Sequence, residues 1–391
     1  MALPPVLLFS LLLHALIGWH VAPDLTQLNP TLGQALWVAL GVSALLMPMG
    51  MLARRVATPP LSTVLTWLGL LCMGLFSSLL VLTVLREVLL LGTWLIDSLW
   101  SQALTLQTKK NLSINTAIAL PIVALLVTTL GFWNARRTAT VMQVDVPIAN
   151  LPEALQGFTV AQISDIHVGP TIKTRYLQRI VDRVNGLNAH MVAITGDLVD
   201  GSVAELGHHV AVLAQLRSTH GSFFVTGNHE YYSGANSWID ALRNLGIQVL
   251  INEHVLIHHN TDARDQDTAL MVIAGVADYS AHHFDETHRS DPHKAMANAP
   301  EDAVFKLLLA HQPRSATAAA DAGFDLQLSG HTHGGQFWPW NLFVPLQQPF
   351  TAGLHRLQSL WVYTSRGTGY WGPPKRFGAP SEITQLRLVR A

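Results

Sequence analysis

The sequence predicts a chain of two unlike parts, an all-α membrane domain of about four transmembrane helices followed by an α/β domain. Up to residue 137, long apolar runs hold only seven of the 24 basic and three of the 25 acidic residues. Beyond that point the composition is that of a soluble domain, in which short apolar strands alternate with amphipathic helices. We therefore expect a multi-pass transmembrane domain at 1–137 and a soluble α/β domain at 138–391.

Four apolar runs in the first part approach the length of a bilayer crossing, which needs about 20 predominantly apolar residues. A further apolar stretch, Val88 to Trp100, is short for a span and is expected to be interfacial or re-entrant. A cleaved signal peptide is disfavoured for the first run, because no basic residue precedes it and three more runs follow. The four runs lie at 3–19, 32–52, 61–86 and 117–133.

The basic residues at the ends of the runs predict the orientation. With four spans, Arg54-Arg55 and Arg136-Arg137 lie on one side and Lys109-Lys110 on the other. Since cytoplasmic loops carry the excess of Lys and Arg, the first side is predicted to be cytoplasmic. We expect a protein of the cell (inner) membrane whose soluble domain, attached at Arg136-Arg137, faces the cytoplasm.

Charge and cysteine content exclude several classes of function. The net charge of −1 leaves no basic surplus, which argues against a nucleic-acid partner. The single cysteine, Cys72, lies in an apolar run, so one chain has neither a disulfide framework nor a thiolate metal site. The expected partner is the lipid bilayer.

Alternating strands and helices are predicted in the soluble domain. Strands at 158–163, 191–195 and 222–226 are each followed by an amphipathic helix, which predicts a sheet with helices on its outer face. The polar stretch His282 to His293 is expected to be a loop. After residue 247 strands dominate, at 248–251, 270–273, 306–309, 326–328, 360–364 and 383–389.

Five polar fragments each come directly after one of these predicted strands. Alone, each is better explained as a turn, a cap or surface histidines. Together they offer only carboxylate, imidazole and amide ligands, which suit Zn, Mn or Fe(II), and such groups are costly at strand ends unless paired or metal-bound. The fragments are Ser164-Asp165-Ile166-His167, Gly196-Asp197, Gly227-Asn228-His229-Glu230, Ala310-His311-Gln312-Pro313 and Gly330-His331-Thr332-His333.

The order DxH, GD, GNHE, H and GHTH resembles the calcineurin-like metallophosphoesterase superfamily. The extended segments QISDIHVG, ITGDLVDG, VTGNHEYY, SGHTHGGQFWP and SRGTGYWGPPKRFGAPSEIT resemble its membrane-anchored branch, typified by the YkuE-like phosphoesterases and the animal transmembrane protein with a metallophosphoesterase domain. The likeness covers the chain from about Val141 to its end. It implies a four-layer α/β/β/α sandwich with metals at the sheet edge. Arg314 departs from the family, where an acidic residue is expected.

The resemblance also implies the ligands of two divalent metal ions, of which Mn, Fe and Zn are the candidates. Asp197 would bridge the two ions through its carboxylate. The other ligands would be Asp165, His167 and His333 for the first ion and Asn228, His311 and His331 for the second.

A metal-dependent phosphoric ester hydrolase is the implied activity, cleaving a phosphodiester or phosphomonoester bond by attack of a metal-bridging hydroxide. His229 would not be a ligand, but would protonate the leaving alkoxide or stabilise charge on the phosphoryl group. Asp200 matches the family position that orients this histidine, although a helix N-cap explains it equally well. Glu230 is the alternative supporting residue.

Other functions stay open at this point. The substrate is expected to be a phosphorylated small molecule or a lipid, and the runner-up activity is hydrolysis of a lipid-linked pyrophosphate of the UDP-2,3-diacylglucosamine type, in lipid A synthesis. A catalytically idle membrane scaffold and a membrane sensor that regulates the phosphoesterase are further possibilities. Trp338 and Trp340 are expected to pack against the core, with an apolar lip for an amphiphilic substrate as the alternative.

Overall fold

The computed structural model describes residues 3–100, 104–260 and 269–391 and divides the chain into two compact units. The helical unit comprises Met1–Trp133 together with Gly372–Phe377. The sandwich unit comprises Asn134–Trp371 and Gly378–Ala391. The boundary predicted at residue 137 stays a prediction, close to this division.

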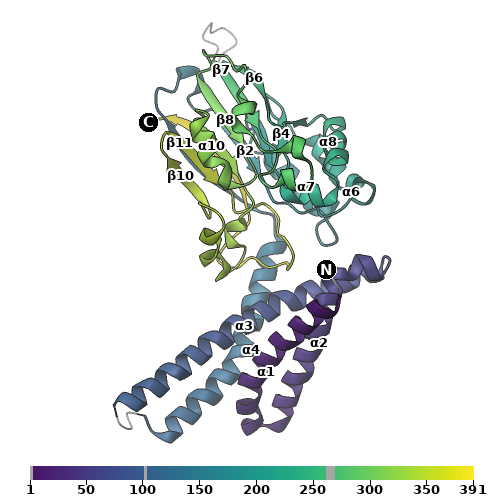
Figure 1. The fold of residues 1–391 in the computed structure, drawn as a ribbon, viewed down its shortest axis with the longest axis vertical. Coiled ribbons are helices and arrows are strands. Elements are labelled where there is room, and N and C mark those ends of the chain that lie inside the picture. The colour runs from purple at the N-terminus through teal and green to yellow at the C-terminus, as the bar shows by residue number, and fades with distance from the viewer. Residues whose placement is uncertain (1–2, 101–103, 261–268) are drawn as a thin grey trace. The chain divides into compact units, whose positions relative to one another are not determined.

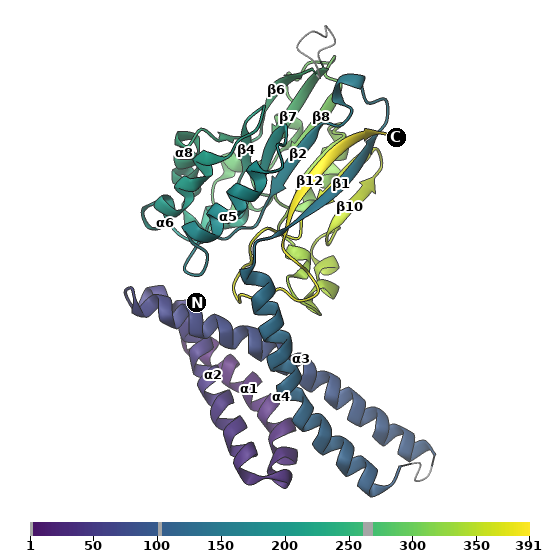
Figure 2. The ribbon, with the colours of Figure 1, turned by 180° about the vertical axis from the view of Figure 1, so that it is seen from behind.

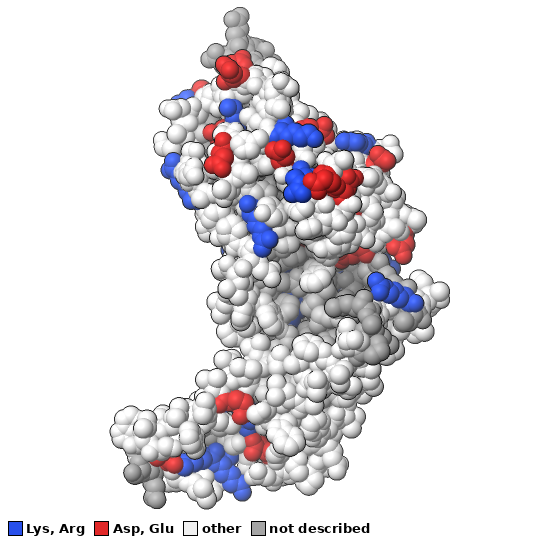
Figure 3. All heavy atoms as spheres, viewed as in Figure 1, with Lys and Arg blue, Asp and Glu red and all other residues white. Residues whose placement is uncertain are grey.

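Long apolar helices make up the helical unit (Figure 1). In the part of the chain that the structure describes, four helices are long and apolar enough to cross a membrane. The visible face of this unit carries few charged side chains, whereas charged side chains are spread over the sandwich unit (Figure 3). The helices are α1 (Leu3–Leu28), α2 (Pro30–Val56), α3 (Leu61–Leu99) and α4 (Leu106–Arg136).

Helix α3 continues through Arg86 and Glu87, so the prediction of a separate segment at Val88 to Trp100 is wrong. The buried Arg86 guanidinium forms an ion pair with Asp24 on α1 and donates a hydrogen bond of 3.1 Å to Thr116 Oγ1 on α4. It also bonds the Glu87 carboxylate at 2.6 Å. Because these groups satisfy the charge inside the bundle, the polar pair does not end the helix.

The first sheet of the sandwich unit carries three of the five polar fragments. Strands β2 to β5 run parallel, while β12 is antiparallel to β2 and parallel to the edge strand β1 (Figure 2). In spatial order the strands are β1 (Thr140–Ile148), β12 (Glu382–Arg390), β2 (Thr159–Ile163), β3 (Met191–Thr195), β4 (Ser222–Val225) and β5 (Gln248–Val249).

The second sheet carries the other two fragments. Its four inner strands, β11, β9, β8 and β7, are parallel, and the edge strands β10 and β6 are antiparallel to their neighbours. In spatial order the strands are β10 (Gly353–Leu357), β11 (Leu360–Thr364), β9 (Leu326–Ser329), β8 (Phe305–Leu309), β7 (Ala269–Gly275) and β6 (Glu253–His259).

Three hydrophobic cores show the four-layer α/β/β/α arrangement that the resemblance implies. One lies between the first sheet and its helices, with Leu177 against Ile194. The central core joins the two sheets through side chains such as Phe223 and Leu307. The third packs the second sheet against Ala319 and its neighbours. The helices are α5 (Thr174–Asn185), α6 (Val203–Val210), α7 (Asn228–Ser233), α8 (Ala235–Asn244), α9 (Pro292–Ala295) and α10 (Ala316–Asp321).

Every strand and helix predicted in this unit is present, with ends that differ by a few residues. Strands β1, β6 and β10 were not predicted. All three are edge strands in which few side chains are fully buried, so the apolar pattern that marks an inner strand is weak in them. The predicted loop at 282–293 contains short 3-10 turns and the start of α9.

Candidate metal centre

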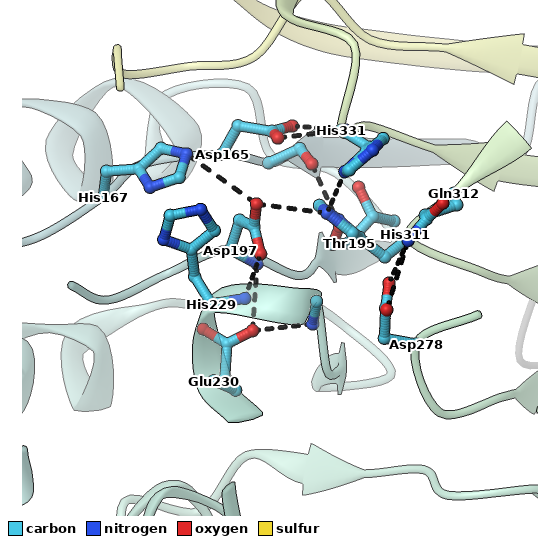
Figure 4. A network of polar contacts seen from close by, with 12 residues as sticks. Asp165, His167, Thr195, Asp197, His229, Glu230, Asp278, His311, Gln312 and His331 are labelled. Carbon is cyan, nitrogen blue, oxygen red and sulfur yellow. Dashed lines mark hydrogen bonds and ion pairs between the residues drawn. The ribbon is translucent and has the colours of Figure 1, made fainter. Parts of the chain in front are cut away.

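The five polar fragments converge because each follows the carboxyl end of a parallel strand. Within a sheet these ends meet at one edge, and the two sheets pack face to face, so the fragments of both sheets come together there (Figure 4). The residues delivered are Asp165 after β2, Asp197 after β3, Asn228 after β4, His311 after β8 and His331 after β9.

The backbone at this edge adopts a conformation that side chains rarely tolerate. Five of the predicted ligands have φ in the left-handed region, a strain of roughly 1–3 kcal/mol each that persists at functional sites. Such turns aim consecutive side chains of a fragment into one small volume. The five are Asp165 (53°), His167 (56°), Asp197 (51°), His331 (69°) and His333 (52°).

Close approach of the loops explains why two of the fragments contain glycine. A Cβ at Gly196, whose φ is +81°, would lie 2.6 Å from the Gly227 nitrogen and 2.7 Å from His311 Nδ1. A Cβ at Gly227 would lie 2.2 Å from Asp197 Oδ1. Glycine at both positions therefore lets the loops after β3 and β4 pack against each other.

One group of ligand atoms comes from Asp165, His167 and His333, the three residues predicted for the first metal. The two imidazole Nε2 atoms are 3.1 Å apart, and His333 Nε2 is 3.5 Å from Asp165 Oδ1. All three side chains are at least nine-tenths buried. This spacing suits three ligands that share one cation.

The second group contains Asp197, His311 and His331. His331 Nδ1 is 3.2 Å from His311 Nε2, which is itself 3.2 Å from Asp197 Oδ2. The same carboxylate oxygen is 3.9 Å from His167 Nε2 in the first group. Asp197 therefore lies between the two groups, where a bridging ligand would be needed.

Asn228 provides a test of whether a cation fits here. Its Oδ1 is buried and has no hydrogen-bond partner among the described residues, although burying an unpaired amide oxygen is costly. A divalent cation would satisfy this oxygen. The donor set of carboxylates, imidazoles and an amide oxygen therefore fits a pair of borderline or hard divalent cations.

Two histidines are held in the tautomer that a metal requires. His167 Nδ1 lies 3.0 Å from the Asp200 carboxylate, and His311 Nδ1 lies 2.7 Å from the Thr195 carbonyl oxygen. Both partners only accept hydrogen bonds, so each Nδ1 carries the proton. Each Nε2 lone pair is then directed to the candidate metal positions, as in known histidine metal sites.

His229 sits beside the two groups with its imidazole against that of His167, ring centroids 4.7 Å apart. Its Nδ1 is 2.6 Å from Asp200 Oδ1, and its backbone N–H donates to Asp197 Oδ1 at 2.9 Å. Burial opposes its protonation, but the hydrogen bond to Asp200 and the charge of Asp197 raise the pKa of His229 to about 9. These two carboxylates therefore favour the protonated form of the imidazole.

Asp200 is not a helix cap, because Ser202 occupies the N-cap position of α6. Its carboxylate instead contacts Nδ1 of both His167 and His229. Burial would raise the pKa of Asp200, but these two histidines lower it well below its usual range. A charged Asp200 thus orients a candidate ligand and the candidate proton donor together.

Glu230 does not orient His229, the role for which the sequence offered it as an alternative to Asp200. Its buried carboxylate does not bond His229, but accepts hydrogen bonds from the backbone N–H groups of Gly227 (2.6 Å), Asp197 (3.0 Å) and Leu198 (2.8 Å). It joins the loops after β3 and β4. Glu230 therefore supports the position of Asp197 through its backbone.

Sequence reasoning missed Asp278, which is fully buried next to the site. Its carboxylate accepts hydrogen bonds from Gln312 Nε2 at 3.1 Å and from Ser280 Oγ at 2.5 Å. Gln312 directly follows His311, so this contact fixes the loop that carries the ligand. Asp278 comes shortly after β7, which ends at Gly275, whereas the predicted strand ended at residue 273. Looking for polar residues just after a strand would have found Asp278 if the predicted strand had reached Gly275.

The calcineurin-like phosphoesterase family model matches residues 158–335. The chain is 39% identical to a transmembrane protein with metallophosphoesterase domain of Bos taurus, over 73% of this chain and 65% of that protein. It is 31% identical to an uncharacterized metallophosphoesterase of Aquifex aeolicus (59% and 84%) and 28% identical to YkuE of Bacillus subtilis (61% and 81%). The chain thus spans slightly less than two thirds of the length of the bovine protein.

Proposed function

Because the chain belongs to the calcineurin-like phosphoesterase family, we propose that it is a membrane-bound, dimetal-dependent hydrolase of phosphodiester or phosphomonoester bonds. The observation that carries the proposal is the pair of ligand groups joined by Asp197, with His229 beside them. A scaffold without activity would have no need for such a set of buried, strained and tautomer-fixed side chains.

The candidate ligands form one set for each of two ions. Asp165, His167 and His333 would hold one ion, Asn228, His311 and His331 would hold the other, and Asp197 would be shared by both. When bound, such a pair of cations neutralises phosphoryl charge and lowers the pKa of an attacking water. Arg314, which departs from the family pattern, donates to the Gln347 carbonyl oxygen at 2.7 Å and leaves the His311 ligand position intact.

His229 supplies the proton in this scheme. Asp200 holds Nδ1–H, so Nε2–H is the proton that can be given to a leaving alkoxide. The Glu230 carboxylate keeps the Asp197 backbone in place, and through it the His229 N–H that bonds Asp197. The same imidazole, if it stays protonated, also stabilises negative charge on the phosphoryl group.

Turnover by the purified full-length protein tests the function. We expect hydrolysis of bis-p-nitrophenyl phosphate or p-nitrophenyl phosphate in the presence of Mn²⁺, Zn²⁺ or Fe²⁺, loss of activity after chelation, and recovery when metal is returned. Bound metal measured by mass spectrometry should approach two ions per chain. A metal-loaded protein that turns over neither ester, nor a lipid-linked pyrophosphate of the UDP-diacylglucosamine type, would support the idle scaffold instead.

For the orientation we propose that the sandwich unit faces the cytoplasm. Arg54-Arg55 and Arg136-Arg137 outnumber Lys109-Lys110, which favours the side that carries Arg136 as the cytoplasmic one. A reporter fused after Ala391 should be active only if it functions in the cytoplasm, and protease outside intact cells should spare the sandwich unit. Activity of a reporter that works only outside the membrane would reverse the assignment.

A further inference from the structure

Two exposed aromatic rings flank the candidate proton donor. The Tyr232 ring packs edge-on against His229 at 5.2 Å between centroids, and the Trp371 ring does so at 5.7 Å. Tyr232 is 63% exposed and Trp371 54% exposed, so neither ring is covered by the rest of the protein. The mostly buried His229 imidazole therefore contacts two aromatic rings that are themselves largely exposed.

The position of Trp371 is fixed by the loop that carries the metal ligands. Gln336, three residues after His333, donates from Nε2 to the Trp371 carbonyl oxygen and accepts from the Trp371 N–H, both at 2.8 Å. The Gln336 side chain is buried. Such a paired hydrogen bond fixes the Trp371 backbone relative to the loop that carries the candidate ligands.

The leaving alcohol is the part of the substrate that would lie near these two rings. A group that protonates the leaving oxygen must lie within hydrogen-bond distance of it. The carbon skeleton of the leaving alcohol is attached to that oxygen and so extends past His229, towards Tyr232 and Trp371. Burying apolar surface against two exposed rings is favourable, whereas a small polar alcohol would leave them in water.

Further exposed apolar residues lie on the segment that follows His333. Trp340 and Phe343 lie there with ring centroids 5.8 Å apart. Both Trp338 and Trp340 are exposed, which contradicts the prediction that they pack against the core. The exposed residues there are Trp338 (45%), Trp340 (40%), Leu342 (64%), Phe343 (53%) and Leu346 (81%).

We propose that the preferred substrate is a lipid phosphoester, in which the leaving alcohol carries an alkyl or acyl chain that lies against Tyr232 and Trp371. This inference rests on the proposed phosphoesterase function and adds the substrate class. A nucleoside could also stack on aromatic rings, but the exposed side chains after His333 are aliphatic as well as aromatic, which favours a lipid chain.

A chain-length series tests the proposal with the full-length protein in detergent. The substrates are ethyl, butyl, hexyl and octyl phosphates and the matching methyl alkyl phosphodiesters, used below their micelle concentrations. We expect kcat/KM to rise about 10-fold or more from ethyl to octyl, as burial of added methylenes predicts. Trp371→Ala and Tyr232→Ala should each bring the octyl-to-ethyl ratio towards one. Trp94→Ala, an exposed ring on α3, should keep the wild-type ratio.

The outcomes separate this inference from the function on which it rests. Failure to hydrolyse any ester would contradict the phosphoesterase itself. Hydrolysis with a flat dependence on chain length would overturn the lipid assignment and leave the function standing. Faster turnover of adenosine monophosphate than of octyl phosphate, lost in Trp371→Ala, would show that the rings stack a nucleobase and would also overturn it.

Discussion

Replacing Asp197 by alanine is expected to abolish activity and to lower the metal content from about two ions per chain to one or none. Asp197 is the only one of the predicted ligands that lies between both groups, with Oδ2 3.2 Å from His311 Nε2 and 3.9 Å from His167 Nε2. Without this carboxylate the metal ions would no longer stabilise the charge of the transition state. Losing several kcal/mol of that stabilisation corresponds to a decrease in kcat/KM of about 10³-fold or more.

Metal analysis and kinetics on the same preparation check this prediction. His333→Ala, which removes a ligand of one group only, should keep more metal than Asp197→Ala. Asp182→Asn, an exposed carboxylate on α5, should behave as wild type in both measurements. Thermal unfolding of each variant shows whether the sandwich unit is still folded. If Asp197→Ala retained two ions and normal turnover, the bridging assignment would be wrong.

The convergence of the ligands could be predicted from the sequence because it follows from strand order. A short apolar strand that ends in Asp165 or Asp197 delivers that residue to the carboxyl edge of a parallel sheet, whatever the details of the loop. The same reasoning put His311 and His331 just after the predicted strands at 306–309 and 326–328. Side-chain chemistry and chain order were therefore sufficient to propose the site.

Contacts that depend on how loops pack could not be predicted in the same way. The carboxylate of Glu230 bonds backbone N–H groups of Asp197 and Leu198, and backbone groups leave no pattern in a sequence. Asp200 was undecided between a cap and an orienting residue until Ser202 was found at the cap of α6. Both cases require the positions of two loops relative to each other.

In the helical unit, too, contacts between segments far apart in the chain could not be predicted from the sequence. A basic and an acidic residue side by side at Arg86-Glu87 predict the end of an apolar segment, yet α3 continues to Leu99. The charge is tolerated because Asp24 and Thr116 on other helices reach the guanidinium. Likewise, no composition signal showed that Gly372–Phe377, so late in the chain, packs with helices near its start.

Replacing His229 by alanine is expected to lower kcat by about 10²–10⁴-fold, the usual contribution of a positioned acid–base group, with metal content unchanged. His229 is absent from the ligand set predicted by resemblance, and its Nδ1 is engaged by Asp200 at 2.6 Å. It does contribute an atom to a third cluster with His167 and Asp197, so a metal analysis is part of the test. The loss of metal in His229→Ala would make it a ligand.

The loss of activity in His229→Ala, compared between good and poor leaving groups, shows which role the imidazole has. If Nε2–H protonates the leaving alkoxide, the loss in His229→Ala should be large for an alkyl phosphate and small for p-nitrophenyl phosphate, because p-nitrophenolate leaves without a proton. His258→Ala, an exposed histidine on β6, should match wild type with both substrates. An equal loss for both leaving groups would instead assign His229 to stabilising charge on the phosphoryl oxygens, a role that its raised pKa also permits.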